Sequence, residues 1–336
     1  MRFGPVPLAQ AEGAILAHSL RAGGTRLRKG QRLGASEIAT LAEAGQAEVV
    51  VARLEPGDVA EDAAAARLAA GIAADPAAAG LTGASPFTGR ANLYAGAAGL
   101  ALIDAARVDA VNRVDPAITL ATLPRFARVA PGLLVATVKI IAYGVPTERL
   151  EAAIAVAAGA VRVAPFRLRS AGLVMTRVPG QPERLNAKGQ SAVTARLAGL
   201  GMTLAGVAEV VHETAALADA LARAPGEAVL VLTGSATSDL HDTAPEALRA
   251  AGGRIERFGM PVDPGNLLFL GALGDGRPVI GLPGSARSPV AHGADWVLER
   301  VACGLSVSSH DIAAMGVGGL LKEIPIRPQP RERRRV

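Results

Sequence analysis

AVLVLTGSATSDLHDTAPEAL, residues 228–248, joins an apolar run to a polar loop and then to a helix-forming segment. The five consecutive apolar residues at 228–232 are typical of a strand that is buried on both faces. The loop is rich in Gly, Ser, Thr and Asp, and either Asp242 or Thr243 is suited to cap the helix that follows. This order of strand, loop and helix predicts an α/β fold.

The same alternation of apolar runs and helical segments extends over much of the C-terminal half. We expect strands at 172–178, 207–211, 228–232, 254–258, 267–273 and 278–282, and helices at 189–200, 214–223, 244–251 and 286–303. Strands separated by helices favour a mainly parallel sheet with both faces covered, in which 172–178, 228–232 and 278–282 are neighbours. Ligands of such sheets bind beyond the carboxyl ends of the strands.

The 336 residues predict two domains and a tail. Residues 1–164 are expected to form a mixed α+β domain, with Ala-rich helices at 58–74 and 147–159, whereas the Gly/Ala-rich segment 76–99 shows no clear pattern. The α/β domain is predicted at 165–325. Residues 326–336 are predicted to be a basic, disordered tail.

The composition excludes several classes of protein. Half of the residues are hydrophobic, which provides a large core, but six Phe, two Tyr and one Trp are too few for binding nucleic acid by base stacking. The net charge is +5, and the last ten residues, with five Arg and one Glu, carry most of it. One cysteine, Cys303, cannot form an internal disulfide.

No uncharged stretch reaches the length needed to cross a bilayer, and the first residues lack the apolar run of a signal peptide. We therefore expect a cytoplasmic protein with no membrane partner. Nucleic acid is disfavoured as a partner.

A second loop, GLPGSARSP at 281–289, also follows an apolar strand. Glycines permit close approach of the backbone, and hydroxyls and backbone N–H groups can cradle an anion. Neither loop is a P-loop or a dinucleotide fingerprint, and an ordinary connection is the alternative interpretation of each. Because there are two, we predict that 233–243 and 281–288 converge on one anion pocket.

Both loops resemble motifs of molybdenum cofactor assembly. Thr233-Gly234 with Asp242-Thr243-Ala244-Pro245-Glu246-Ala247 is similar to the Gly-Gly … Asp-x-Thr-Pro-Glu-Ala signature of molybdopterin adenylyltransferases and related molybdopterin-binding domains. Lys188-Gly189 resembles their Asp-Lys-Gly step. Pro264-Gly265-Asn266 and Gly281-Leu282-Pro283-Gly284-Ser285 resemble the Pro-Gly-Lys-Pro … Gly-Leu-Pro-Gly-Asn-Pro pattern of molybdopterin molybdenumtransferases. The resemblance extends over roughly 165–305.

The chain departs from these patterns at several positions. Thr233 stands where the families have their first glycine, and Ser285 replaces the Asn of Gly-Leu-Pro-Gly-Asn. Asp242 lies one residue further from Gly234 than the pattern has it, so Asp239 competes for the role of the family aspartate.

The resemblance implies a three-layer α/β/α molybdopterin-binding domain. It assigns cofactor binding to Thr233, Gly234, Ser235, Lys188, Gly189, Gly265, Asn266, Pro283, Gly284 and Ser285. Asp242, with Asp239 as its rival, is the candidate catalytic residue, and Asp242 is the candidate ligand of Mg²⁺. A helix cap is the alternative role of Asp242.

Three functions remain open at this point. The first is an enzyme of molybdenum cofactor assembly, acting by adenylyl transfer or molybdate insertion and needing Mg²⁺. The second is a non-catalytic molybdopterin carrier or regulatory binding protein. The third is a nucleotide hydrolase that shares the fold. The expected partners are a small-molecule pterin, further copies of the chain in a homo-oligomer, and other cofactor-assembly proteins.

Overall fold

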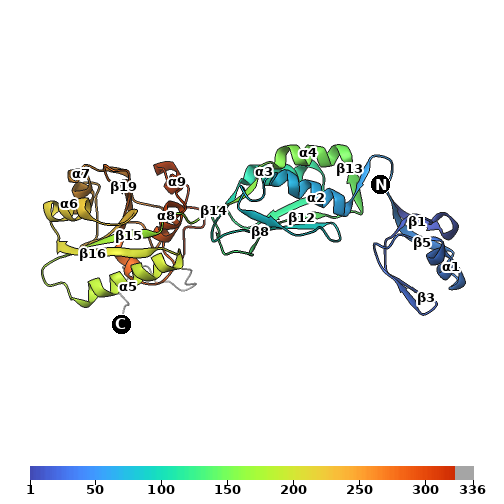
Figure 1. Cartoon of the computed structure of the whole chain (residues 1–336), viewed down its shortest axis with the longest axis horizontal. Coiled ribbons are helices and arrows are strands. Elements are labelled where there is room, and N and C mark those ends of the chain that lie inside the picture. The colour runs from blue at the N-terminus through green and yellow to red at the C-terminus, as the bar shows by residue number, and fades with distance from the viewer. Residues whose placement is uncertain (322–336) are drawn as a thin grey trace, which may run out of the picture. The chain divides into compact units, whose positions relative to one another are not determined.

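The computed structural model describes residues 1–321 (Figure 1). The chain divides into two compact units, Met1–Pro165 and a second one that begins at Phe166. The basic tail predicted at 326–336 lies outside the described residues. Among residues 1–321, no helix combines the length and the apolar character that spanning a bilayer requires.

The first 53 residues form a small antiparallel sheet with one helix. The elements are β1 (Arg2–Pro7), η1 (Leu8–Gln10), β2 (Ile15–Leu16), β3 (Leu20–Ala22), β4 (Thr25–Leu27), α1 (Ala35–Glu43) and β5 (Glu48–Arg53). β5 lies between β1 and β2, and β3 and β4 make a separate hairpin. Leu16, Leu33 and Leu41 are fully buried and form the centre of a core of their own.

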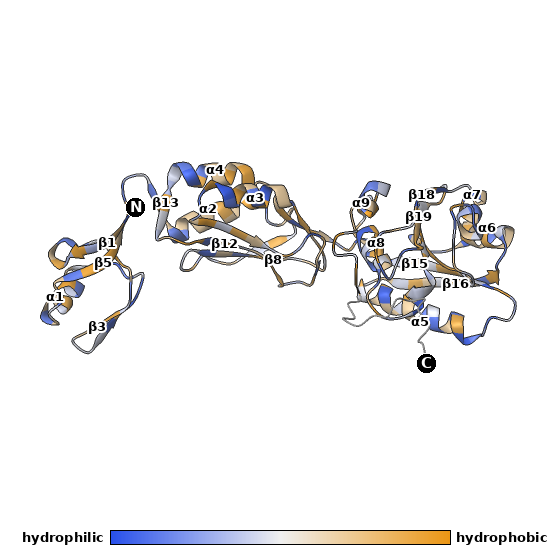
Figure 2. Ribbon diagram, turned by 180° about the vertical axis from the view of Figure 1, so that it is seen from behind, coloured by the Kyte–Doolittle hydropathy of each residue, from blue (hydrophilic) through white to orange (hydrophobic). Residues whose placement is uncertain are grey.

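The rest of the first unit packs three helices on antiparallel strands. The elements are β6 (Asp58–Ala60), α2 (Glu61–Ile72), β7 (Leu81–Gly83), β8 (Arg90–Ala95), β9 (Gly99–Ile103), α3 (Ala105–Val114), β10 (Ile118–Thr122), β11 (Arg128–Val129), β12 (Leu134–Ile140), β13 (Gly144–Pro146), α4 (Thr147–Ala157) and β14 (Val161–Pro165). Their order is β10-β12-β8-β7 in one sheet and β11-β9-β14 in another. Figure 2 shows hydrophilic and hydrophobic residues on both α2 and α4, as expected for helices with one buried face.

Two details of this unit differ from the sequence interpretation. The Ala-rich helix expected to start at residue 58 begins at Glu61, because Asp58–Ala60 pairs as β6 with β13. The Gly/Ala-rich segment 76–99 forms β7 and β8, in which Ala91, Leu93 and Ala95 alternate with more exposed residues. Because many residues of this segment are small and apolar, the alternation of buried and exposed positions is not visible in the sequence.

The second unit is a mixed α/β structure around a six-stranded sheet. Its elements are β15 (Ser170–Arg177), α5 (Arg184–Gly199), β16 (Thr203–Val211), α6 (Thr214–Arg223), β17 (Ala228–Leu232), α7 (Thr243–Ala250), β18 (Arg254–Phe258), β19 (Phe269–Ala272), β20 (Pro278–Leu282), η2 (Gly284–Arg287), α8 (Gly293–Ala302) and α9 (Ser309–Ala313). The strand order is β16-β15-β17-β20-β19-β18.

The central strands of this sheet confirm the predicted neighbours. β15 pairs with β17 and β17 pairs with β20, all in the parallel sense. All five residues of β17 are buried, which accounts for its unbroken apolar sequence. Val229 and Val231 pack with residues of α6 and α7, whereas α5 approaches Leu232 at Gly189. β16 pairs with β15, also in the parallel sense, whereas β19 and β18 are antiparallel to their neighbours.

The helix predicted at 286–303 is wrong in its first half. Gly284–Arg287 makes only a 3₁₀ turn, and the α-helix begins at Gly293. Pro289 is the physical reason, because its ring and its missing N–H cannot continue a helix that starts before it. The residues from 288 to 292, predicted as helical, instead form a loop at the edge of the sheet.

Candidate functional site

The candidate site lies where three neighbouring strands end. β17 runs parallel to β15 and to β20, and its last residue, Leu232, pairs with Met175 on one side and Leu282 on the other. Parallel strands leave the sheet at the same edge, so the segments that follow them start side by side. The segments 233–243 and 281–288 are therefore neighbours at this edge.

Thr176, near the end of β15, holds the start of the segment after β17. Its side chain is 0% exposed. The Gly234 N–H donates to Thr176 Oγ1 at 2.8 Å, and His212 Nδ1 lies 2.8 Å from the same oxygen. A Cβ at Gly234 would overlap Gln181 Oε1 and come within 3.0 Å of the Thr176 carbonyl oxygen. Close packing therefore requires glycine at position 234.

Two amide side chains fix the loop between β15 and α5. The Val178 N–H donates to Gln181 Oε1 at 3.3 Å, and Gln181 Nε2 donates to Asn186 Oδ1 at 2.9 Å. Asn186 is buried, and its Nδ2 donates to the Thr176 carbonyl oxygen at 3.4 Å. Buried polar groups that are hydrogen-bonded in this way hold a loop in one conformation.

Arg287 connects the two predicted loops. Its side chain is 8% exposed, and its Nη2 donates to the carbonyl oxygen of Thr233 at 2.8 Å. Its Nε is buried without a hydrogen-bond partner among residues 1–321, and burial lowers the pKa of the guanidinium. A guanidinium nevertheless keeps its charge in proteins. The edge of the sheet therefore contains a buried positive charge that hydrogen-bonds a neutral oxygen.

Gly189 and Lys188 lie on α5 with different surroundings. A Cβ at Gly189 would come within 2.5 Å of Leu232 Cδ2 and 3.7 Å of Arg287 Nε, so glycine lets the helix approach both. Lys188 is exposed. The structure thus gives Gly189 a packing role against Arg287. Contact of Gly189 or Lys188 with a cofactor remains a prediction.

His292 orients Ser285 in the segment after β20. His292 is 1% exposed, its Nδ1 accepts the Ala294 N–H at 3.1 Å, and its Nε2 lies 2.7 Å from Ser285 Oγ. Because Nδ1 acts as an acceptor, the proton of the neutral ring is on Nε2 and is donated to the serine. Ser285 is exposed and keeps its own hydroxyl proton to donate. The pair positions a hydrogen-bond donor, and His292 in this tautomer cannot deprotonate the serine.

Arg196 of α5 holds the segment after β20 through hydrogen bonds. Its Nε donates to Asp295 Oδ1 at 2.6 Å, its Nη1 donates to the Ala286 carbonyl at 2.8 Å, and its Nη2 donates to the Ser288 carbonyl at 2.8 Å. One planar guanidinium therefore fixes two backbone carbonyls of the loop and the first turn of α8. The exposed groups of the loop can therefore contact a ligand without a change in the conformation of its backbone.

Asp242 is the N-cap of α7, as the alternative interpretation of this residue predicted. Its Oδ1 accepts the Thr243 N–H at 2.7 Å and its Oδ2 accepts the Ser238 N–H at 2.9 Å. Burial acts to raise the pKa of Asp242, but these backbone hydrogen bonds and the nearby His212 outweigh it, and the pKa is lowered. Asp239 is exposed and accepts the His241 N–H at 2.8 Å.

The lowered pKa of Asp242 gives a test of the capping role. We expect Asp242→Asn to keep the cap but to lose the stabilisation that the carboxylate provides. This stabilisation is fully present above the unfolded pKa, about 3.9, and is lost as the pH falls through the folded pKa. Urea unfolding from neutral to acid pH should therefore show a difference between wild type and variant that shrinks below about pH 4. A difference that does not vary with pH would contradict this role.

The remaining residues predicted to bind the cofactor differ in their exposure. Asn266 Nδ2 donates to the Met260 carbonyl at 3.2 Å, and Gly265 is buried against Gly293 at the start of α8. Thr233 and Pro283 are buried, whereas Ser235 and Gly284 are exposed. The exposed residues of the two loops are thus those able to meet a ligand.

Sequence reasoning missed the residues that hold these loops in place. They are Thr176, Gln181, Asn186, Arg196, Arg287 and His292. Arg287 and His292 stand within or just after a motif that had been singled out, and their burial is the property that the sequence does not reveal. Thr176 and Arg196 are polar residues inside apolar patterns, which was the available signal. Gln181 and Asn186 lie in a polar segment that gives no such signal.

In the described part of the chain, no group of three or more His, Cys, Asp or Glu side chains is arranged to hold a metal ion. Neither Asp242 nor Asp239 therefore belongs to such a group. Mg²⁺ commonly binds through one or two carboxylates together with substrate phosphates and water.

Comparison with known proteins adds little to this geometry. Residues 5–53 match the model of a family described as "Domain of unknown function (DUF8806)". No curated protein matches the chain. Among solved structures, the chain is similar to a molybdopterin biosynthesis moea protein from Pyrococcus horikosii, with a TM-score of 0.30 and 14% sequence identity, over 90% of this chain and 76% of that chain. The function is therefore argued from the residues of the edge itself.

Proposed function

We propose that the second unit is a three-layer molybdopterin-binding domain that binds molybdopterin, or its adenylylated form, in molybdenum cofactor assembly. The observation that carries the proposal is the buried guanidinium of Arg287, which joins the two glycine-containing loops at the edge of the sheet. A buried cation is costly unless an opposite charge compensates it. The motifs of these two loops are those that resemble the molybdopterin families.

The chemistry of the ligand fits the groups at this edge. Molybdopterin has a terminal phosphate, a pterin with hydrogen-bonding edges and a dithiolene. The exposed Ser285 hydroxyl is a hydrogen-bond donor, and Arg287 supplies positive charge beside Gly284, 3.5 Å from the position of a Cβ there. In the proposal the phosphate binds these groups, with the backbone of Gly234 and Ser235 facing the pterin.

A non-catalytic carrier is the second candidate function, and one observation favours it. Each carboxylate oxygen of Asp242 already accepts a backbone N–H. A carboxylate oxygen has further lone pairs, so Asp242 can still bind Mg²⁺, but its capping role needs no metal. The two candidates therefore differ in whether Mg²⁺ takes part in binding.

The decisive experiment measures binding of molybdopterin and its adenylylated form to the full chain under anaerobic conditions, with and without Mg²⁺. An enzyme is expected to bind more tightly with Mg²⁺ and to lose that dependence in Asp242→Asn. Asp239→Asn is the matched control, because it removes a carboxylate from the same loop. If both variants and the wild type bind equally with and without Mg²⁺, the protein is a carrier. Absence of binding to either pterin would reject the proposal.

A further inference from the structure

The sheet of the second unit has an open edge at β18. β18 is the last strand in the order and pairs with β19 alone among the described residues. An edge strand presents backbone N–H and C=O groups on its free side, and these can pair with another extended chain. The residues around this edge therefore decide what kind of chain it can accept.

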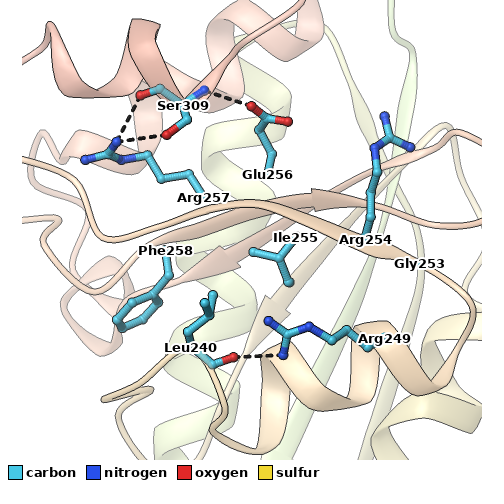
Figure 3. Close-up of a pocket in the computed structure, with 9 residues that line it drawn as sticks. All are labelled: Leu240, Arg249, Gly253, Arg254, Ile255, Glu256, Arg257, Phe258 and Ser309. Atoms are coloured by element: carbon cyan, nitrogen blue, oxygen red, sulfur yellow. Dashed lines mark hydrogen bonds between the residues drawn. The ribbon is translucent and has the colours of Figure 1, made fainter.

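A β-bulge sorts the side chains of β18 onto two sides. Ile255 pairs with Gly271 and Arg257 pairs with Leu270, so Glu256 is the extra residue of the bulge. Figure 3 shows the result: Ile255 and Phe258 point to one side of the strand, whereas Arg254 and Glu256 point to the other. A strand of strict alternation would place Ile255 and Phe258 on opposite sides.

An open pocket of about 610 Å³ follows this edge. On its apolar side lie Leu240, Ile255 and Phe258, of which Ile255 and Phe258 also pack against the core. On its basic side lie Arg254, Glu256, Arg257 and Ser309, so that this side has two guanidinium groups and one carboxylate. The pocket is thus a groove along an open strand, with an apolar wall and a basic wall (Figure 3).

The basic wall has two arginines and one carboxylate, that of Glu256, and no ion pair joins them among residues 1–321. Arg257 donates to the Gly259 carbonyl at 2.7 Å and to both oxygens of Ser309 at 3.0 Å, all of which are neutral. Arg254 is exposed. Glu256 accepts the Ser309 N–H at 2.9 Å, and across the groove Arg249 is already paired with Glu246. An acidic side chain in the groove would therefore meet two guanidinium groups, neither in an ion pair within the described part of the chain, against the one carboxylate of Glu256.

We propose that β18 binds an extended acidic segment of a partner protein as an added strand. Its backbone would pair with the free side of β18, and its side chains would alternate between the two walls. Apolar residues of the segment contact Leu240, Ile255 and Phe258, and aspartate or glutamate residues contact Arg254 and Arg257. A second copy of β18 fits poorly, because two copies would bring four arginines together with two glutamates.

The test uses the full chain and three labelled peptides of equal length. Their repeats are Asp-Val, Lys-Val, and Asp-Val with a proline in the middle. Fluorescence anisotropy should show the Asp-Val peptide binding at least about tenfold more tightly than the Lys-Val peptide, with a steep loss at high salt. The proline peptide should bind weakly, because it lacks a strand N–H. Equal binding of the Asp-Val and Lys-Val peptides would overturn the proposal.

A variant and an exchange experiment locate the binding. Arg254→Glu should weaken the Asp-Val peptide by about tenfold or more, whereas Arg223→Glu, an exposed arginine on α6, should have no effect. Hydrogen exchange should slow in 254–258 when the peptide is added. Protection elsewhere, or an unchanged affinity of Arg254→Glu, would overturn the proposal. Protection of 254–258 that rises with protein concentration in the absence of peptide would show self-pairing instead. No pterin is used, so the outcome is independent of the proposed function.

Discussion

Arg287→Met is expected to lower the affinity for molybdopterin by at least about 30-fold. Removing one member of a buried, hydrogen-bonded charge pair typically costs about 2–5 kcal/mol, and each 1.4 kcal/mol corresponds to about tenfold in affinity. Methionine keeps the apolar stem but removes the group that donates to the Thr233 carbonyl and that compensates the phosphate in the proposed site. Anaerobic titration of the full chain with molybdopterin measures the effect.

Two further variants separate the loss of binding from a loss of folding. Arg287→Lys keeps the positive charge without the planar fork, so its affinity should fall between those of wild type and Arg287→Met. Arg223→Met removes an arginine that is exposed on α6 and should bind normally. Thermal unfolding without ligand shows whether each variant is folded. A folded Arg287→Met protein with wild-type affinity would remove the basis of the proposed anion site.

The sheet around this arginine was predictable, because it depends on local patterns. Residues 228–232 and 278–282 are short apolar runs bounded by turn residues, and such runs predict buried parallel strands when helices separate them. The loops after them were also located correctly by position, since each begins where an apolar run ends. Both features are properties of a few consecutive residues.

The framework of the candidate site was not predictable, because it depends on pairs far apart in the chain. Arg287 donates to Thr233, which is 54 residues earlier, and Thr176 accepts the N–H of Gly234, which is 58 residues later. A single sequence contains no signal for such pairs. Arg287 beside Ser288-Pro289 has the composition of an exposed turn, but in the structure it is buried, with α5 close to it at Gly189.

The predicted helix at 286–303 shows a different kind of limit. The apolar spacing after Gly293 is helical, and it was extended backwards across Pro289. In the structure the α-helix begins only at Gly293, after that proline, and the residues before Pro289 belong to the loop that Arg196 holds. A proline inside a periodic segment is therefore a stronger indication of where the helix begins than the periodicity is.

Gly281→Val is expected to prevent the second unit from folding. Gly281 lies within β20, and a Cβ there would overlap the ring of Phe269 on the adjacent strand β19. Phe269 is fully buried, so its ring has no free space to move into. Overpacking of a core usually costs about 1–3 kcal/mol and sometimes more, and here the clash is with an aromatic ring in the hydrophobic core of the second unit. Soluble yield and urea unfolding of the purified chain measure the effect.

A double variant tests whether the ring is the cause. Phe269→Leu removes Cε1 and Cζ, two of the three atoms that a Cβ at position 281 would meet, and replaces the rigid ring by a side chain whose Cδ atoms can turn away. Gly281→Ala should therefore be less harmful in that background than in the wild type. Gly284→Ala is the control, because a Cβ there would have only an ordinary contact with Arg287. That variant should fold with wild-type stability. If Gly281→Ala alone is as stable as wild type, the close contact between β19 and β20 does not determine the fold. The position of Arg287 after β20 would then depend on its packing against α5 instead.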